Sequence, residues 1–275
     1  MDKLLASLTW DLRPEVIPGL SYLRWYSLFW ALGIYLGFMI MARIFRKEGL
    51  DLGILDKLVL TVMIGLVIGA RLGHILFYDP VYYLNNPVEI LPIRIDPHFE
   101  FTGLQGLASH GGVVGALIGL WVFNRKHQLG FLWATDRLII AGALLGGFIR
   151  LGNFFNSEII GLPAQIPWAV VFSRIDSVPR HPAQLYEATF YFVVFLLLYR
   201  IWKRKKFSKT GFLTGLGLAL IFGQRFLIEF LKEDQVSFES SMTLNMGQLL
   251  SIPVMVFGLS MMILKRKSSK PYHQA

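Results

Sequence analysis

The chain of 275 residues contains no cysteine, and only 16% of its residues are charged. Without cysteine, a fold held together by disulfide bonds is excluded. Soluble globular proteins carry roughly 25% charged residues, so this chain is poor in charge. It is correspondingly rich in apolar residues, with 54% hydrophobic and a mean hydropathy of +0.52. Intrinsic disorder requires low hydrophobicity and is also excluded, which leaves a polytopic membrane protein as the favoured class.

The chain carries a net charge of +9, from 27 Lys and Arg residues against 18 Asp and Glu residues. A soluble nucleic-acid-binding protein can have that charge, but it does not share the apolar content. We therefore expect no nucleic-acid partner and interpret the basic excess as information about membrane topology.

Seven stretches have the roughly 20 mostly apolar residues that a membrane-spanning helix needs. They are residues 20–42, 57–78, 104–124, 136–155, 184–202, 210–231 and 246–264. The sequence thus predicts an all-α polytopic membrane protein with about seven transmembrane helices, in which residues 1–275 form a single integral membrane domain.

The basic residues predict the orientation of these spans. Of the 27 Lys and Arg residues, 17 fall in the C-terminal tail, in the connections after the first, third and fifth spans, or at the span ends next to these connections. Cytoplasmic loops collect Lys and Arg, so the N-terminus is predicted outside and the C-terminus in the cytoplasm. Residues 1–19 lack a signal-peptide cleavage site and are predicted to form an interfacial arm, with Leu4, Leu5, Leu8 and Leu12 at helical spacing.

Two long connections on the outer side, residues 79–103 and 156–183, contain the strand-like runs "PIRIDPHFEF" and "WAVVFSRI". We expect them to form a small extracytoplasmic cap. Within the spans, glycines recur every four residues, as in Gly65, Gly69 and Gly73. This spacing is typical of close helix packing in membranes.

Ionisable residues within a span are functional candidates, because a charge near the bilayer centre costs at least about 2.5–3.5 kcal/mol. Arg71 and His74 share a helix face at the end of the second span; snorkelling to the interface is the alternative role. His110 precedes two glycines in the third span, where a ligand can approach the backbone closely. Its imidazole can exchange protons near neutral pH.

The fourth span ends in a polar cluster comprising Arg150, Asn153, Asn156 and Glu158. A structural Arg150–Glu158 pair is the alternative to a binding role, and even that pair implies a protein-lined or water-filled site.

In the sixth span, Arg225 and Glu229 stand four residues apart, so an internal ion pair is the alternative there. Gln224 and Lys232 add further donors. Arginines from different helices at one depth near the outer leaflet favour a phosphate, whose oxygens fit the guanidinium group. The simplest such ligand is a phospholipid head group.

The sequence contains no zinc-binding cluster, P-loop or dinucleotide-binding motif, and no serine in a nucleophile elbow. We therefore predict no metal and no cofactor. A transporter or flippase for an anionic lipid is the main alternative to an enzyme, although no repeated half-sequence of the kind found in many transporters is evident.

The run "RLGNFFNSEIIG", residues 150–161, resembles the signature of bacterial prolipoprotein diacylglyceryl transferases. Five further motifs follow the order of that family and extend the resemblance over about the whole chain. They are "RWYSLFWALG", "GARLGHILFYDP", "SHGGVVGALIG", "RHPAQLYEA" and "RFLIEFLKED".

The resemblance implies a multi-pass enzyme of the bacterial cytoplasmic (inner) membrane. Such an enzyme moves the sn-1,2-diacylglyceryl group of phosphatidylglycerol to the lipobox cysteine that follows a prolipoprotein signal peptide, forming a thioether and releasing glycerol phosphate. The matching positions imply a functional set of Tyr26, His110, Arg150, Asn153, Glu158, Gly161, Arg225 and Glu229.

By this resemblance, Arg150 and Arg225 stabilise the departing phosphate and His110 is the candidate base. The alternative is that His110 binds phosphate and the arginines lower the pKa of the thiol. Tyr26 and Asn153 orient the head group, the carboxylates of Glu158 and Glu229 hold the arginines, and Gly161 permits close backbone approach. Asn156, Arg71 and His74 are added as substrate-binding candidates from their positions alone.

The chain departs from the family pattern at three places. Ile149 and Ser157 stand where the family often has glycine, and Lys232-Glu233-Asp234 replaces a segment that often holds Arg and a Pro-Asp step.

Overall fold

The computed structural model describes residues 8–19, 23–91, 93–94, 98–101, 106–205, 209–233 and 242–263. These residues are mostly helical, which confirms the predicted all-α fold class. They fall into two compact units, the first within Met1–Ile44 and Thr135–Pro271 and the second within Phe45–Ala134.

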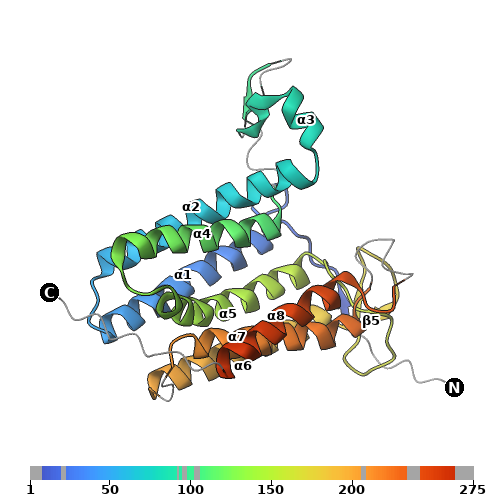
Figure 1. Ribbon diagram of the computed structural model, residues 1–275. Coiled ribbons are helices and arrows are strands. Elements are labelled where there is room, and N and C mark those ends of the chain that lie inside the picture. The colour runs from blue at the N-terminus through green and yellow to red at the C-terminus, as the bar shows by residue number, and fades with distance from the viewer. Residues whose placement is uncertain are drawn as a thin grey trace. The chain divides into compact units, whose positions relative to one another are not determined.

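The first unit contains most of α1 and α5, all of α6, α7 and α8, and the short helix η2 that continues α7 (Figure 1). Their bounds are α1 Trp25–Lys47, α5 Phe131–Phe155, α6 Ala183–Lys203, α7 Phe212–Ile228, η2 Glu229–Leu231 and α8 Met246–Ile263. The second unit contains α2 Leu52–Phe77, α3 Pro80–Asn85, η1 Pro87–Ile90 and α4 Ser109–His127.

Six helices among the described residues are long and apolar enough to cross a membrane: α1, α2, α5, α6, α7 with η2, and α8. The predicted span 104–124 corresponds to α4, which is not among the six. Helix α4 begins with Ser109 and His110 and ends in the polar run Asn124–His127, so its apolar part is shorter than its 19 residues.

Close packing unites the helices of the first unit. A Cβ atom placed on Gly33 of α1 would lie 2.8 Å from Leu145 of α5, and one on Gly215 of α7 would lie 2.6 Å from the Gly258 carbonyl oxygen of α8. The start of α7 is fixed by the buried Asp136 of α5. Its carboxylate accepts hydrogen bonds from the backbone amides of Gly211 and Thr214 at 2.7 and 2.8 Å.

In the second unit, α2 and α4 pack along their glycines and lie side by side (Figure 1). A Cβ atom on Gly115 would lie 2.0 Å from the carbonyl oxygen of Gly65, and one on Gly111 would lie 2.3 Å from that of Gly69. The packing predicted from the glycine spacing is therefore confirmed for this pair.

A three-stranded sheet closes one end of the first unit. Strand β1 (Leu8–Trp10) pairs in parallel with β4 (Val170–Phe172), which pairs antiparallel with β5 (Pro179–Arg180). The helix implied by the leucine spacing of the N-terminal arm is therefore wrong at Leu8, which lies in a strand and pairs with β4. Leu4 and Leu5 lie outside the described residues.

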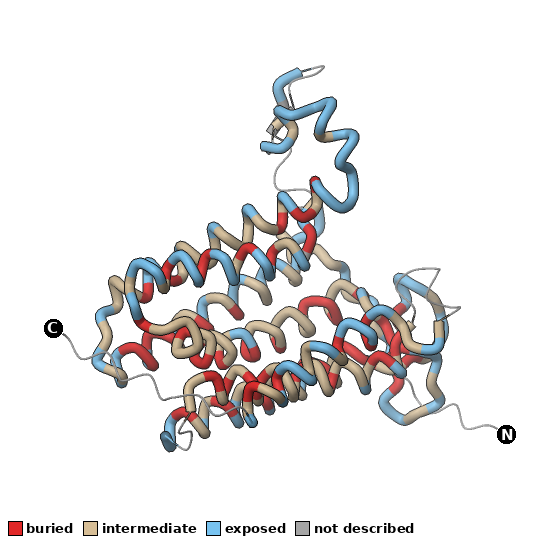
Figure 2. Tube along the Cα trace, viewed as in Figure 1, coloured by how far each residue is buried: buried red, intermediate tan, exposed pale blue. Residues whose placement is uncertain are grey.

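The strand-like runs in both long connections do form strands. Connection 156–183 supplies β4 and β5, and its Val170 and Phe172 pack with Phe154 and Ile160 in a small core. Connection 79–103 supplies the antiparallel pair β2 (Ile93–Arg94) and β3 (Glu100–Phe101) in the second unit. Figure 2 shows α3 and its neighbours as largely exposed. A joint cap stays a prediction.

Candidate functional site

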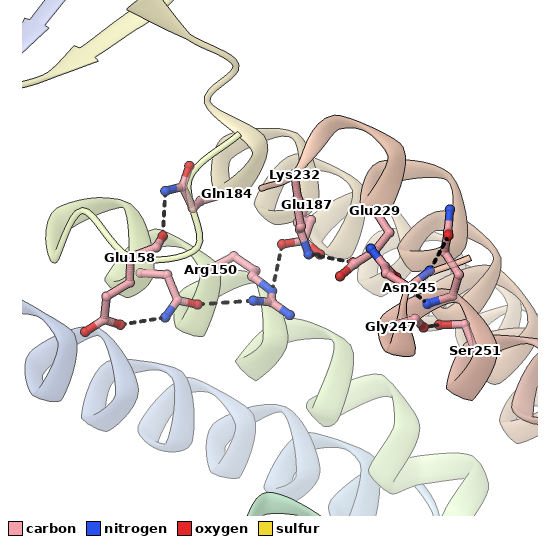
Figure 3. Close-up of polar contacts among 11 residues, drawn as sticks. Arg150, Glu158, Gln184, Glu187, Glu229, Lys232, Asn245, Gly247 and Ser251 are labelled. Carbon is pink, nitrogen blue, oxygen red and sulfur yellow. Dashed lines mark hydrogen bonds and ion pairs between the residues drawn. The ribbon is translucent and has the colours of Figure 1, made fainter. Parts of the chain in front are cut away.

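A network of ion pairs joins α5, α6 and the segment that follows α7 (Figure 3). Nε of Arg150 lies 3.1 Å from Oε2 of Glu187, in the first turns of α6. The other oxygen of Glu187 lies 2.9 Å from Nζ of Lys232, which also lies 3.1 Å from Oε2 of Glu229. We call these four residues the ionic network.

The ionic network is buried inside protein rather than turned towards lipid. The residues Glu187, Glu229 and Lys232 are 1%, 6% and 6% exposed. Isolated charges are far too costly to bury, so they occur in pairs that satisfy each other. Two cations and two carboxylates balance here, so Arg150 and Lys232 are both neutralised by the protein itself.

A second branch leads from Arg150 through amides to Glu158. Nη1 of Arg150 donates to Oδ1 of Asn153 at 3.3 Å, and Nδ2 of Asn153 donates to Oε2 of Glu158 at 3.1 Å. Asn156 donates to the other oxygen of Glu158 at 3.1 Å. The carbonyl of Glu158 accepts a hydrogen bond from Gln184 at 2.6 Å. The direct Arg150–Glu158 ion pair, the alternative raised from the sequence, is therefore not formed among the described residues. Asn153 instead lies between the two side chains and hydrogen-bonds both.

Tyr26 lies beside this branch. A Cβ atom on Gly152 would lie 2.9 Å from Cδ2 of Tyr26, so the absence of a side chain there lets α1 approach α5. The structure thus places Tyr26 beside the branch that links Arg150, Asn153 and Glu158, while the roles of these four residues stay predictions.

Arg225, in the last turn of α7, is placed differently from Arg150. Its Nε atom is buried and has no hydrogen-bond partner within the part of the chain that the structure describes. The alternative Arg225–Glu229 pair is not formed there, because Glu229 pairs with Lys232. Tyr191 of α6 is half-buried and lies within electrostatic reach of both Arg150 and Arg225, and a Cβ atom on Gly146 of α5 would lie 2.6 Å from its ring.

Gly161 lies where three backbone segments meet. Its amide donates to the carbonyl of His181 at 3.2 Å, and a Cβ atom on it would lie 2.4 Å from that oxygen and 2.8 Å from the carbonyl oxygen of Leu231. The close approach expected at Gly161 is therefore made by the protein's own backbone.

Arg180 reinforces this junction outside the spanning helices. It donates to the Gly161 carbonyl at 3.2 Å and forms ion pairs with Asp176 and Glu233. Hydrogen bonding by the Arg180 guanidinium lowers the pKa of Asp176 below its ordinary value.

The remaining candidates belong to the second unit. Arg71 donates to the backbone carbonyls of Glu89, Ile90 and Gly106, with Nε 3.0 Å from the Ile90 oxygen. His74 stacks on Tyr78, with 5.3 Å between ring centroids. Through its contacts with these carbonyls, Arg71 holds the connection after α2 in place. His110 is exposed in the first turn of α4. Substrate contacts by these three residues stay predictions.

Three residues of this site were not assigned a role from the sequence: Gln184, Glu187 and Tyr191. Glu187 lies inside the predicted fifth span and inside the motif "RHPAQLYEA". The rule that ionisable residues in spans are functional candidates could have found it. Tyr191 gives no such signal in a helix rich in aromatic residues.

The fold and the site together define a class of protein. It is a multi-pass membrane protein in which the polar side chains of the site lie buried between helices rather than facing lipid. Within the described residues, no group of three or more His, Asp or Glu side chains is placed to hold a metal ion.

The particular family is shown by comparison with known proteins. The prolipoprotein diacylglyceryl transferase family model matches residues 16–264, and the chain belongs to this family. Similar relatives named phosphatidylglycerol–prolipoprotein diacylglyceryl transferase occur in several bacteria. The one from Bacteroides fragilis is 46% identical over 98% of this chain and 100% of its own length. The one from Tolumonas auensis is 47% identical, covering 94% and 98%.

Proposed function

We propose that this protein is a transferase that moves the sn-1,2-diacylglyceryl group of phosphatidylglycerol to the cysteine thiol of prolipoproteins. Membership of the family and the names of its relatives support this reaction. The acceptor is the lipobox cysteine beside the signal peptide, and the site of action is the bacterial cytoplasmic membrane. The basic loops further support an N-terminus outside and a C-terminus in the cytoplasm.

One observation carries the proposal at the level of the site. Arg150 and Lys232 are neutralised by Glu187 and Glu229, whereas Arg225 has no ion pair within the described residues. Among the described residues, the site therefore offers one guanidinium group whose charge no carboxylate balances. A phosphate diester is an anion whose oxygens fit such a donor.

In the reaction, the acceptor sulfur forms a bond to the glycerol carbon of the lipid while the bond from that carbon to the phosphate oxygen breaks. Glycerol phosphate leaves with the electron pair, and a thioether remains. Arg225 stabilises the charge that develops on the departing phosphate, an effect worth several kcal/mol in a preorganised site. Arg150, fixed by Glu187 and Asn153, presents its remaining donors from a defined position.

The thiol must lose its proton before or during attack, because the thiolate is the nucleophile and a free thiol has a pKa near 8.5. We assign the base role to His110. The competing assignment places His110 on phosphate and lets the arginines lower the pKa of the thiol. Tyr26 and Asn153 orient the head group by hydrogen bonds.

The test is a reconstitution of the purified protein in vesicles of phosphatidylglycerol with a lipobox peptide. Mass spectrometry should find a diacylglyceryl adduct on the peptide cysteine, and Arg225→Ala should abolish it while the protein stays folded. Adduct formation by Arg225→Ala would refute the phosphate role. Lipid movement across the bilayer without an adduct would instead support a flippase.

His110→Gln separates the two assignments for the base. If His110 is the base, turnover collapses across neutral pH and recovers partly at alkaline pH, where the thiol ionises unaided. Near-normal turnover at neutral pH would remove His110 from that role.

A further inference from the structure

Gln224 is a buried amide without hydrogen bonds in the described part of the chain. It is 6% exposed, and neither its nitrogen nor its oxygen has a partner there. A buried polar group left unpaired costs about 1–3 kcal/mol. Gln248 on the neighbouring α8 is buried to a similar degree, but its amide contacts the backbone of Asn245 and Phe226 at 3.1 and 3.5 Å.

The register of α7 shows which way Gln224 faces. The buried residues Leu213, Gly217, Ile221 and Gln224 are spaced four, four and three apart, so they share one helix face. That face meets two of the neighbouring helices, α5 and α6. A Cβ atom on Gly217 would lie 2.4 Å from Ile139 of α5 and 3.2 Å from Leu198 of α6.

Gln224 lies on that face about two turns farther along, at the end of α7 that carries the site. Helices α5 and α7 run in the same direction here, because the ionic network joins Arg150 near the end of α5 to Lys232 just after α7. The segment from Gly217 to Gln224 therefore leads towards the network, as the segment from Ile139 to Arg150 does. Gln224 is thus placed towards the site and immediately precedes Arg225.

The chemistry of an amide identifies the group that would satisfy it. Gln224 offers two N–H donors and an oxygen acceptor, whereas the phosphate diester oxygens only accept. Phosphate alone would leave the amide oxygen unpaired. A hydroxyl both donates and accepts, and the head group of phosphatidylglycerol carries two hydroxyls beside its phosphate.

We propose that Gln224 binds a hydroxyl of the head-group glycerol while Arg225 binds the adjacent phosphate, which makes Gln224 a residue that sets lipid specificity. This inference rests on the proposed function. It explains why an unpaired amide is kept in a helix whose other buried residues are apolar or glycine.

The test compares two lipid donors in the vesicle assay. Phosphatidylpropanol has the same charge and the same number of head-group carbons as phosphatidylglycerol but no head-group hydroxyl. The wild-type protein should prefer phosphatidylglycerol. Gln224→Leu should lower kcat/KM for phosphatidylglycerol roughly tenfold, as expected for lost hydrogen bonds, and leave phosphatidylpropanol unaffected.

Thermal unfolding supplies a readout that a structural glutamine would not produce. Gln224→Leu should melt no lower than the wild type, because it removes an unpaired buried amide. Gln248→Leu is the matched control and should melt lower while retaining the lipid preference. Gln224→Met, unbranched like glutamine, gives the same test in a second variant.

An unchanged ratio of kcat/KM for the two lipids in both Gln224 variants overturns the inference, as does a wild type that does not discriminate. Failure of the proposed function is distinguishable, because the wild-type protein would then form no adduct on the peptide with either lipid.

Discussion

Lys232 and Glu187 form an ion pair of 2.9 Å between side chains that are 3% and 1% exposed. The same ammonium also holds Glu229, so one cation satisfies carboxylates on two different elements. Truncating one member of a buried pair leaves its partners charged and unmatched, at a cost of about 3–5 kcal/mol.

We therefore expect Lys232→Met to lower the free energy of unfolding by that amount, measured by denaturation in detergent. Adding Glu229→Gln should restore much of the lost stability. In the double variant, Glu187 still pairs with Arg150, and no buried carboxylate of the ionic network is left without a cation. Strictly additive effects of the two substitutions would contradict this account of the ionic network.

The glycine packing of α2 and α4 gives a second prediction. In Gly115→Ala the new methyl group would meet the Gly65 carbonyl oxygen at 2.0 Å, and backbone cannot yield as a flexible side chain does. We expect a loss of about 1–3 kcal/mol from overpacking, seen as a lower Tm.

Gly142→Ala in α5 is the matched control. A Cβ atom there would meet nothing within 4 Å, and alanine favours helix over glycine by about 1 kcal/mol. Its Tm should be unchanged or higher; equal losses in both variants would show that glycine flexibility, rather than helix contact, matters.

Ser157 yields a prediction of increased stability. Its φ is +56°, in the left-handed region that costs a residue with a side chain about 1–2 kcal/mol. Its hydroxyl is buried and has no hydrogen-bond partner in the described segments. Glycine, which the family often has here, should raise the free energy of unfolding by about 1 kcal/mol after its own entropic cost.

The control for this prediction is Ser157→Ala, which removes the hydroxyl but keeps the left-handed strain. It should gain less than Ser157→Gly in the same denaturation experiment. A lower free energy of unfolding for Ser157→Gly than for the wild type would show that the left-handed conformation of Ser157 does not destabilise the fold.

The junction around Arg180 should respond to acid. Because the folded-state pKa of Asp176 is lowered by Arg180, the stability it contributes is present above the ordinary carboxyl pKa and is lost as the pH falls through the lowered value. We expect Tm to fall as the pH drops below about 4, the ordinary carboxyl value. The difference in Tm between wild type and Asp176→Asn should shrink over the same interval; a constant difference would exclude this linkage.

Much of the architecture could be predicted from the sequence, because it depends on local patterns. Apolar runs predicted six helices that the structure forms with spanning length and composition, and the runs around Ile93 and Val170 predicted strands. Prediction failed at Leu8, where pairing with β4 overrides helical spacing. It overestimated α4, whose polar ends shorten its apolar part.

Around Arg150, sequence reasoning named Asn153 and Glu158 as candidates, but it missed Glu187 and did not predict which side chains pair. Residues three or four apart on one helix, such as Arg225 and Glu229, are natural partners by sequence. In the folded chain, Glu229 instead pairs with Lys232, and Arg150 pairs with Glu187 of another helix. Local reasoning could therefore have found Glu187 as a candidate, but not its partners Arg150 and Lys232 on other elements.

By itself, the sequence determined the membrane class, the candidate polar residues and the family resemblance, since these depend on composition, periodicity and motifs. Only the tertiary structure decided which cations the protein neutralises and which buried polar atoms have no hydrogen-bond partner in the described residues, among them Nε of Arg225 and the amide of Gln224. The reason is physical: a buried charge is compensated by whatever carboxylate the packing of helices brings within 4 Å, and that distance is not encoded in local spacing.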